Sequence, residues 1–224
     1  MSQENDLLKN KYSITALFYD ILDYPWERQY RQWRPELLKD VRGKVLEAGV
    51  GTGRNLKYYL PDVQLTGIDL SPTMLNRAEK RAKDARCKVT LKQEDATLLS
   101  SIPSNHFDWI FSTFICCVMP DQLQPLAIQQ FSRVLKPGGR FRLLEMIYSK
   151  NLKVRKKQER FAPFVEKVYG ARFDRNTLHY IQNSENLKVS TTSFLKDDVY
   201  LLIDGVCEKT TINLSGLKDR EDSM

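Results

Sequence analysis

The sequence predicts an α/β protein with a doubly wound, mainly parallel seven-stranded sheet and helices on both faces. From about residue 44 to residue 146, apolar segments of strand length alternate with amphipathic segments of helical length. This alternation is typical of right-handed βαβ units. After residue 146 the alternation ends, and the last two strand-like segments are too close together to enclose a crossover helix. We therefore expect the last strand pair to be antiparallel.

The expected elements follow from the spacing of the apolar residues. Strands are expected at residues 44–48, 64–69, 87–92, 107–113 and 140–146, with the final pair at 187–195 and 199–207. Helices are expected near residues 53–60, 71–85, 121–135, 155–168 and 174–183. Before the first strand, apolar residues at steps of three and four predict two amphipathic helices between residues 12 and 40, interrupted by Pro25.

A glycine-rich segment, VLEAGVGTGRN (45–55), lies between the first strand and the first following helix. Gly49, Gly51 and Gly53 allow a sharp turn and let a ligand approach backbone N–H groups. The dinucleotide-binding pattern GxGxxG would place its third glycine where this chain has Arg54. The chain also lacks the Tyr-x-x-x-Lys pair of short-chain oxidoreductases. The spacing therefore disfavours a nicotinamide-dependent oxidoreductase.

Acidic residues accompany the glycine segment at the spacing of βα units. Asp69 ends the second strand, 20 residues after Gly49, where a carboxylate accepts hydrogen bonds from both ribose hydroxyls of an adenosine moiety. Glu47 precedes the glycines, and Asp95 with Ala96 follows the third strand. A Pro-Gly-Gly turn at 137–139 precedes the fifth strand. Together these features predict a site for an adenosine-containing cofactor.

With these motifs in this order, residues 12–206 resemble the class I S-adenosylmethionine-dependent methyltransferases, in particular the quinone-biosynthesis and phospholipid N-methyltransferases. The resemblance implies S-adenosylmethionine as the cofactor. It also implies a set of cofactor-binding residues, in which the glycine segment holds the methionine part, Asp69 the ribose, and the Asp-Ala pair the adenine. The implied residues are Glu47, Gly49, Gly51, Gly53, Asn55, Asp69, Leu70, Met74, Asp95, Ala96 and Thr113, with Tyr19 of the N-terminal Tyr19–Asp20 pair closing over the cofactor.

The chain departs from the family pattern after the fourth strand. Many relatives carry an Asn and a His-His pair there, and this chain has Thr113 and the pair Cys116–Cys117. The acceptor is therefore not implied by the resemblance. We expect the two cysteines to be core residues, because free cysteine behaves as a small hydrophobe.

A general base is needed only if the acceptor is protonated at neutral pH. Three residues are candidates for that catalytic role: Tyr19, Glu145 and His179. Glu145 ends the fifth strand at the edge of the sheet where such folds bind ligands. His179 lies in the segment expected to cover the substrate.

The sequence thus predicts methyl transfer from S-adenosylmethionine to a small or amphiphilic acceptor, such as a lipid, a quinone or another small molecule. Two alternatives stay open: a non-catalytic S-adenosylmethionine-binding protein, and a nucleic-acid or protein methyltransferase. Methyltransferases of exocyclic amines in nucleic acids typically carry an Asp/Asn-Pro-Pro-Tyr/Phe turn after the fourth strand. This chain has Ser-Thr-Phe-Ile at 112–115, so nucleic acid is not an expected partner. The oligomeric state is open.

At 224 residues the chain has the length of one domain. We expect a single methyltransferase domain at 1–207, with an N-terminal helical lid at 1–40 and a substrate cap at 147–185. Residues 208–224 show no periodicity and are expected to be a disordered tail.

The chain is basic, with a net charge of +7. Four cysteines without CxxC spacing predict neither a metal site nor a disulfide framework. No apolar run has the length of a membrane span, and we expect a cytoplasmic location. Peripheral contact with an anionic membrane surface is among the expected interactions. The basic residues that suggest it are Lys150, Lys153, Arg155, Lys156, Lys157 and Arg160.

Overall fold

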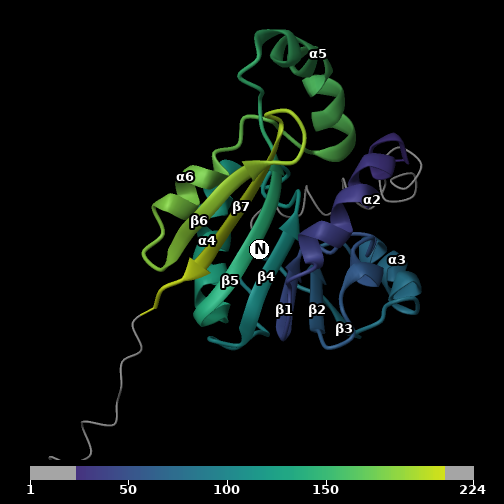
Figure 1. The fold of residues 1–224 in the computed structure, drawn as a ribbon, viewed down its shortest axis with the longest axis vertical. Helices are drawn as coiled ribbons and strands as arrows, with labels where there is room; N and C mark the ends of the chain where they lie inside the picture. Colours follow the sequence, from purple (N-terminus) through teal and green to yellow (C-terminus); the bar gives the residue numbers. More distant parts are fainter. Residues whose placement is uncertain (1–23, 210–224) are drawn as a thin grey trace, which may run out of the picture.

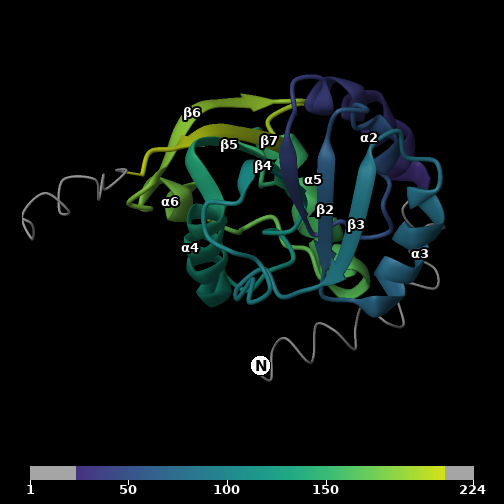
Figure 2. The same cartoon turned by 90° about the horizontal axis from the view of Figure 1, so that it is seen from below.

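The computed structural model describes residues 24–209. They form one seven-stranded sheet with helices on both faces (Figure 1, Figure 2). The strands are β1 (Lys44–Ala48), β2 (Gln64–Asp69), β3 (Lys88–Gln93), β4 (Phe107–Thr113), β5 (Leu135–Met146), β6 (Leu187–Phe194) and β7 (Tyr200–Cys207). The helices are α2 (Tyr24–Leu38), α3 (Pro72–Ala82), α4 (Gln124–Val134), α5 (Leu152–Tyr169) and α6 (Thr177–Gln182), with short 3-10 helices at Leu56–Tyr58 and Asp121–Leu123.

The strand order is β3-β2-β1-β4-β5-β7-β6. Strands β1 to β5 pair in parallel, and β7 pairs antiparallel with both β5 and β6. The expected mainly parallel sheet with an antiparallel last pair is confirmed. The chain runs outward from β1 to β3 and then returns to place β4 on the other side of β1. Ligands of open α/β sheets bind at such a reversal, beyond the carboxyl ends of the strands.

Successive residues of the central strands point to opposite faces and build two separate cores. On β1, Val45 packs into the core under α2 and α3, whereas Leu46 packs into the core under α4 and α6. Trp109 and Ile110 repeat this alternation on β4. Because both faces are covered, these strands are apolar at almost every position, which explains their continuous apolar runs in the sequence.

Some elements differ from their expected bounds. Residues 53–60 form only the 3-10 turn Leu56–Tyr58, because Pro61 lacks an N–H and disfavours helical geometry at the residue before it. Helix α6 covers six residues of the expected 174–183 and packs against α4 and β6. It therefore covers one face of the sheet and is not part of the expected cap. The Glu208 N–H donates to the carbonyl of Asn186, so the first residues of the expected tail are ordered. Residues 1–23 and 210–224 lie outside the described part.

Helices α3 and α5 begin at residues suited to a helix start, and α5 ends at a glycine. The Ser71 hydroxyl accepts a hydrogen bond from the Met74 N–H at the start of α3, and Pro72 follows at the first helical position. The Asn151 side chain caps α5 in the same way, and Gly170 ends α5 with a φ of 71°. That left-handed conformation favours glycine.

Arg142 on β5 joins three parts of the fold. Its guanidinium lies 2.7 Å from the carboxylates of both Asp204 on β7 and Asp40 after α2. It also donates to the backbone carbonyl of Leu37. The Arg142 side chain is only 11% exposed. Its removal leaves Asp204 without this counter-charge and leaves Asp40 with only the more distant Arg140.

We expect Arg142→Ala to lower the free energy of unfolding by about 2 kcal/mol, less than for a fully buried pair because Asp40 is partly exposed. Arg140→Ala is the matched control, since Arg140 is half exposed and 3.9 Å from Asp40. Its effect should stay below about 1 kcal/mol. Urea unfolding measures both, and equal effects would contradict the bridging role of Arg142.

Candidate active site

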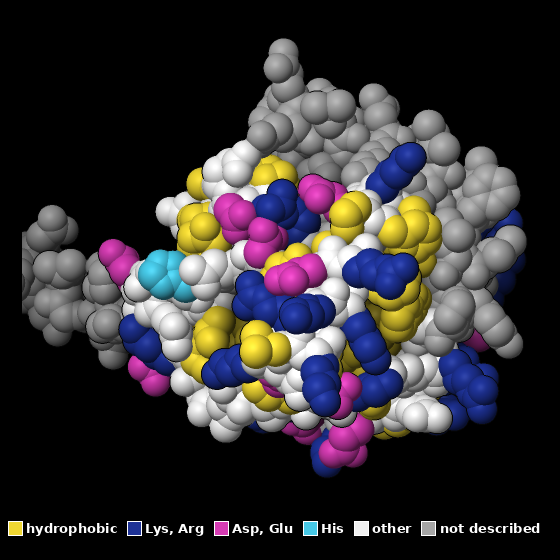
Figure 3. Space-filling view, turned by 90° about the horizontal axis from the view of Figure 1, so that it is seen from above, with side chains coloured by type: hydrophobic (Ala, Val, Ile, Leu, Met, Phe, Trp, Pro, Cys, Tyr) yellow, Lys and Arg dark blue, Asp and Glu magenta, His cyan; other side chains and the backbone are white. Residues whose placement is uncertain are grey.

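A cavity of about 850 Å³ opens at the carboxyl ends of β1, β2 and β4. Its walls come from the glycine segment, from α2 and α5, and from the loop between β6 and β7. Figure 3 views the molecule from the side of α5 and shows basic and hydrophobic side chains interspersed there. The cavity thus lies at the reversal of strand order, where the topology predicts a ligand site.

The glycine segment leaves room for a ligand at Gly51. Gly49 and Gly51 have φ angles of 72° and 54°, a region that glycine adopts without strain. A Cβ on Gly51 would meet nothing closer than the Gly49 carbonyl at 4.0 Å, so this position opens onto free space. Gly53 has another role. A Cβ there would come within 2.9 Å of the Ala78 backbone, so Gly53 lets the loop pack against α3.

Asp69 joins the loops that follow β1 and β2. Its two carboxylate oxygens accept hydrogen bonds from the N–H groups of Gly51 and Ser71, each at 2.9 Å. Desolvation by the surrounding protein raises the pKa of Asp69 to about 6. A carboxylate has about four lone-pair directions. Asp69 lines the cavity and so keeps acceptor capacity for the hydroxyl groups of a ligand.

Glu47 lies behind the cavity wall and orients Asn55. The Asn55 amide donates to Glu47 Oε1 at 2.7 Å, and its carbonyl oxygen accepts from Arg34 Nε at 2.7 Å. Glu47 is 1% exposed, and burial raises its pKa to about 7. Asn55 lines the cavity and Glu47 does not. Glu47 therefore acts on the cavity as a positioning residue, through Asn55.

A charged cluster supports Asn55 from α2. Arg34 and Arg54 both pair with Glu27, at 2.6 and 2.5 Å. Arg34 and Arg54 line the cavity, and the sequence motifs did not single them out. The signal that could have identified Arg34 is its separation of seven residues, or two helical turns, from Glu27 on one helix.

The residues predicted to contact adenine, Met74, Asp95 and Ala96, all line the cavity. Beside the apolar Met74 and Ala96, the polar residues Glu94, Asp95 and Thr97 line the cavity here. Asp95 Oδ1 accepts hydrogen bonds from the N–H and the hydroxyl of Thr97 at 2.8 and 2.7 Å. Thr113 lies at the end of β4, with its hydroxyl 3.4 Å from the Asn55 amide. The predicted residues that line the cavity are Gly49, Gly51, Asn55, Asp69, Leu70, Met74, Asp95, Ala96 and Thr113.

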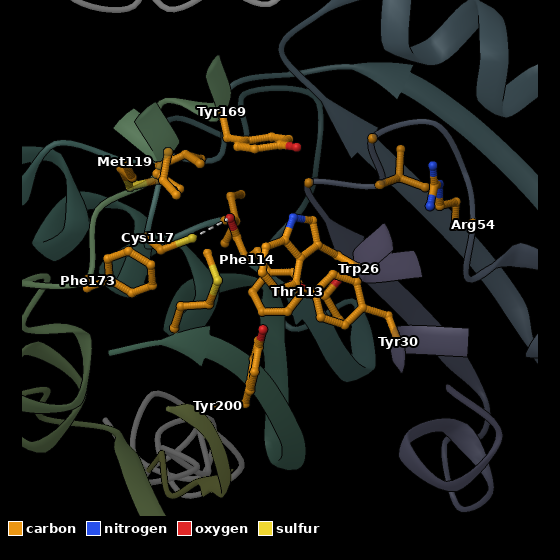
Figure 4. A pocket seen from close by; sticks show the side chains of 18 of the residues that line it. Trp26, Tyr30, Arg54, Thr113, Phe114, Cys117, Met119, Tyr169, Phe173 and Tyr200 are labelled. Carbon is orange, nitrogen blue, oxygen red and sulfur yellow. Dashed lines mark hydrogen bonds between the residues drawn. The ribbon is translucent and has the colours of Figure 1, made fainter. Parts of the chain in front are cut away.

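Aromatic side chains form the opposite part of the cavity (Figure 4). The Tyr30 ring lies 5.0 Å from the Phe114 ring and 5.8 Å from the Tyr200 ring, measured between centroids. Phe114 has a φ of 64°, which is uncommon outside glycine and costs backbone strain. The aromatic residues that line the cavity are Trp26, Tyr30, Phe114, Phe161, Phe164, Tyr169, Phe173 and Tyr200. The sequence motifs indicated none of them as ligand contacts.

Two of the three candidate bases are not placed at the cavity. Glu145 is 2% exposed, and its carboxylate accepts the N–H groups of Cys116 at 3.0 Å and Cys117 at 2.8 Å. Burial raises the pKa of Glu145 to about 7. Glu145 therefore holds the loop after β4. His179 is exposed on α6 and lies 2.9 Å from the Asn183 amide. Neither lines the cavity. The third candidate, Tyr19, lies outside the described residues.

The cysteine pair is buried. Cys116 and Cys117 are both 0% exposed, which agrees with the expected core role. Cys117 also touches the cavity, and its thiol donates to the Phe114 carbonyl at 3.2 Å (Figure 4). Among the described residues, no group of three His, Cys, Asp or Glu side chains is arranged to hold a metal ion.

Comparisons with known proteins agree with this geometry. A methyltransferase domain family matches residues 45–139. The demethylmenaquinone methyltransferase of Staphylococcus aureus is 30% identical over 174 residues, which cover 74% of this chain and 69% of that protein. The chain belongs to the class I S-adenosylmethionine-dependent methyltransferases.

Another relative is the phosphatidylethanolamine N-methyltransferase of Cereibacter sphaeroides, 36% identical over 99 residues. That match covers 43% of this chain, and the chain spans about half of that relative's length (47%). The N-methyltransferase NodS of Bradyrhizobium japonicum, solved with S-adenosyl-L-homocysteine, superposes with a TM-score of 0.61 at 19% identity. The superposition covers 83% of this chain and 89% of that one, and confirms the fold.

The cofactor of this methyltransferase family is S-adenosylmethionine, and the cavity residues fit it. The space at Gly51 accepts a ligand against the backbone. Asp69 keeps acceptor capacity for ribose hydroxyls, and apolar Met74 and Ala96 suit an adenine ring. Asn55, held by Arg34 and Glu47, presents polar atoms for an amino-acid moiety.

We expect Asp69→Ala to weaken S-adenosyl-L-homocysteine binding by about tenfold to more than a hundredfold, because hydrogen bonds to a charged acceptor are lost. Asp69→Asn keeps one acceptor oxygen and should fall between this variant and the wild type. Asp62→Ala, at an exposed carboxylate, is the control. Calorimetry measures all three, and wild-type affinity in Asp69→Ala would show that the ribose site is elsewhere.

Binding should also depend on pH. Because Asp69 has a pKa raised to about 6, it becomes protonated in the free protein as the pH falls, and a neutral acid is the weaker acceptor. Affinity for S-adenosyl-L-homocysteine should therefore decrease about tenfold from pH 7 to pH 5. In Asp69→Asn this decrease should disappear. The same decrease in affinity in both proteins would show that a group other than Asp69 causes the pH dependence.

Proposed function

We propose that this protein transfers the methyl group of S-adenosylmethionine to a small or amphiphilic acceptor bound among the aromatic side chains of the cavity. One observation carries the proposal. A single cavity joins a polar part at Asp69 and Asn55 to an aromatic part at Phe114, Phe173 and Tyr200. The polar part suits the cofactor, and the aromatic part suits an acceptor with a large apolar group.

The chain's own residues act by positioning and by excluding water. S-adenosylmethionine supplies a methyl group that is already activated by its sulfonium. Asp69 and the glycine segment hold the cofactor portion, and the Phe114 side chain lines the aromatic part. Alignment of the reacting groups lowers the activation barrier by about 7–11 kcal/mol in favourable cases. Of the three candidate bases, only Tyr19 keeps that role in this proposal, because Glu145 and His179 are not at the cavity.

The class of acceptor is supported by the lining and by the relatives. The relatives' names specify phosphatidylethanolamine and demethylmenaquinone as acceptors. The aromatic half of this cavity contains few charged groups: Lys157, Lys196 and Asp197 lie among its lining residues. A lipid, a quinone or another apolar small molecule matches it better than a nucleic acid, which would need a basic groove for phosphates.

The activity is tested by incubating the protein with methyl-labelled S-adenosylmethionine and an extract separated into lipid, small-molecule and macromolecular fractions. We expect label in the lipid or small-molecule fraction, and loss of that label with Asp69→Ala. Label in the macromolecular fraction alone would favour a nucleic-acid or protein methyltransferase. Binding of S-adenosyl-L-homocysteine without transfer to any fraction would favour a non-catalytic binding protein.

We expect Phe173→Ala to raise the KM for the labelled acceptor by roughly tenfold or more, because an aromatic contact in the acceptor part is lost. The affinity for S-adenosyl-L-homocysteine should stay the same. Tyr148→Ala is the matched control, since the Tyr148 ring lies 5.4 Å from Phe173 and does not line the cavity. A change in cofactor affinity with an unchanged acceptor KM would reverse the assignment of the two parts.

A further inference from the structure

Large aromatic side chains are exposed at the mouth of the cavity. Phe161 and Phe164 on α5 are 61% and 54% exposed, and Trp26 on α2 is 48% exposed. All three also line the cavity, so its rim is apolar and faces solvent. Clustered exposed apolar side chains mark interaction surfaces in soluble proteins, whereas single ones do not.

Basic side chains flank the same rim. Lys153, Lys157 and Phe161 follow each other at steps of four along α5, and Phe164 follows three residues later, so the four lie along one side of the helix. Arg160 is the exposed neighbour of this row. Within residues 24–209, Lys153, Lys157 and Arg160 make no ion pair, whereas Arg155 on another side pairs with Glu159 at 3.0 Å.

Helix α5 is well placed to be a docking element. It stands beyond the carboxyl ends of the strands, at the top of the view in Figure 1. Only one of its residues, Gln158, is buried. In residues 24–209 no helix has the length and apolarity to cross a bilayer. A helix with aromatic residues on one side and lysines beside them is the pattern that lies in the headgroup region of a membrane.

We propose that α5 docks the mouth of the cavity onto an anionic lipid bilayer, with Phe161 and Phe164 among the acyl chains and Lys153, Lys157 and Arg160 against the headgroups. Charge complementarity selects an anionic lipid surface as the partner. The inference extends the proposed function, because an amphiphilic acceptor would then enter the cavity directly from the bilayer. The docking itself needs neither cofactor nor acceptor, so it is tested separately.

The charge contribution is tested by sedimenting the full chain with phosphatidylcholine vesicles, with and without phosphatidylglycerol. The wild type should pellet with the anionic vesicles at low ionic strength and be released at high salt. Combined Lys153→Gln, Lys157→Gln and Arg160→Gln should weaken binding at least tenfold, since each cation near an anionic surface strengthens it by about fivefold. Combined Lys80→Gln on α3, Lys83→Gln just after α3 and Lys88→Gln on β3 is the equal-charge control and should bind like the wild type.

The aromatic contribution is tested by Phe164→Ser, with the exposed Leu126→Ser on α4 as control. Phe164→Ser should reduce binding to anionic vesicles severalfold, and Leu126→Ser should not. Circular dichroism and light scattering check the fold and the oligomeric state of each variant. A changed oligomeric state in Phe164→Ser would show that a second copy covers the rim, and a large loss of thermal stability would show that the chain itself covers it. Either result overturns the proposal.

Two further outcomes separate this inference from the proposed function. A wild type that binds S-adenosyl-L-homocysteine and stays in the supernatant with anionic vesicles overturns the docking alone. A wild type that pellets with these vesicles and does not bind S-adenosyl-L-homocysteine overturns the proposed methyl transfer alone. Equal loss of vesicle binding in the α5 and control charge variants would attribute binding to net charge and overturn the role of α5.

Discussion

The cavity depends on carboxylates at strand ends that accept hydrogen bonds from the neighbouring loops. Asp69 at the end of β2 binds the N–H of Gly51 in the loop after β1. Glu145 near the end of β5 binds the N–H groups of Cys116 and Cys117 in the loop after β4. Parallel strands bring their carboxyl ends to one edge of the sheet, so each carboxylate reaches the loop of an adjacent strand. These bonds hold the loops that shape the cavity.

Burial of these carboxylates has an electrostatic cost. Desolvation raises the pKa of Asp69 to about 6 and the pKa values of Glu47 and Glu145 to about 7. Burial therefore disfavours their charged forms relative to those of exposed carboxyl groups. Perturbed carboxylates of this kind cluster at functional sites. Here only Asp69 reaches the cavity, while Glu47 and Glu145 act on it through Asn55 and through the loop after β4.

The polar and aromatic parts of the cavity come from different segments of the sequence. The polar part comes from the ends of β1 and β2 and from the glycine segment, within about one βαβ unit. The aromatic part is assembled from α2, from the loop after β4, from α5 and from β7. These elements are distant in sequence and meet only in the folded chain. Helix α5 contributes both to the cavity wall and to the exposed rim.

The sequence by itself predicted the fold class, a mainly parallel sheet with an antiparallel last pair, and most of the polar residues that line the cavity. Strands buried on both faces produce apolar runs of fixed length, and a turn against a ligand requires glycine, so both signals are local. The spacing from Gly49 to Asp69 is one βαβ step, and in the structure the Gly51 N–H donates a hydrogen bond to Asp69.

Only the tertiary structure decided which side chains reach the cavity. At the end of β5, neighbouring residues point to opposite sides, so Met146 lines the cavity and Glu145 does not. His179 lies in the segment expected to be the cap, but α6 packs on the α4 side of the sheet. Arg34 and the aromatic residues reach the cavity from elements with no local motif. Side-chain direction and long-range packing depend on contacts between distant segments, and a sequence pattern of period two or 3.6 does not encode them.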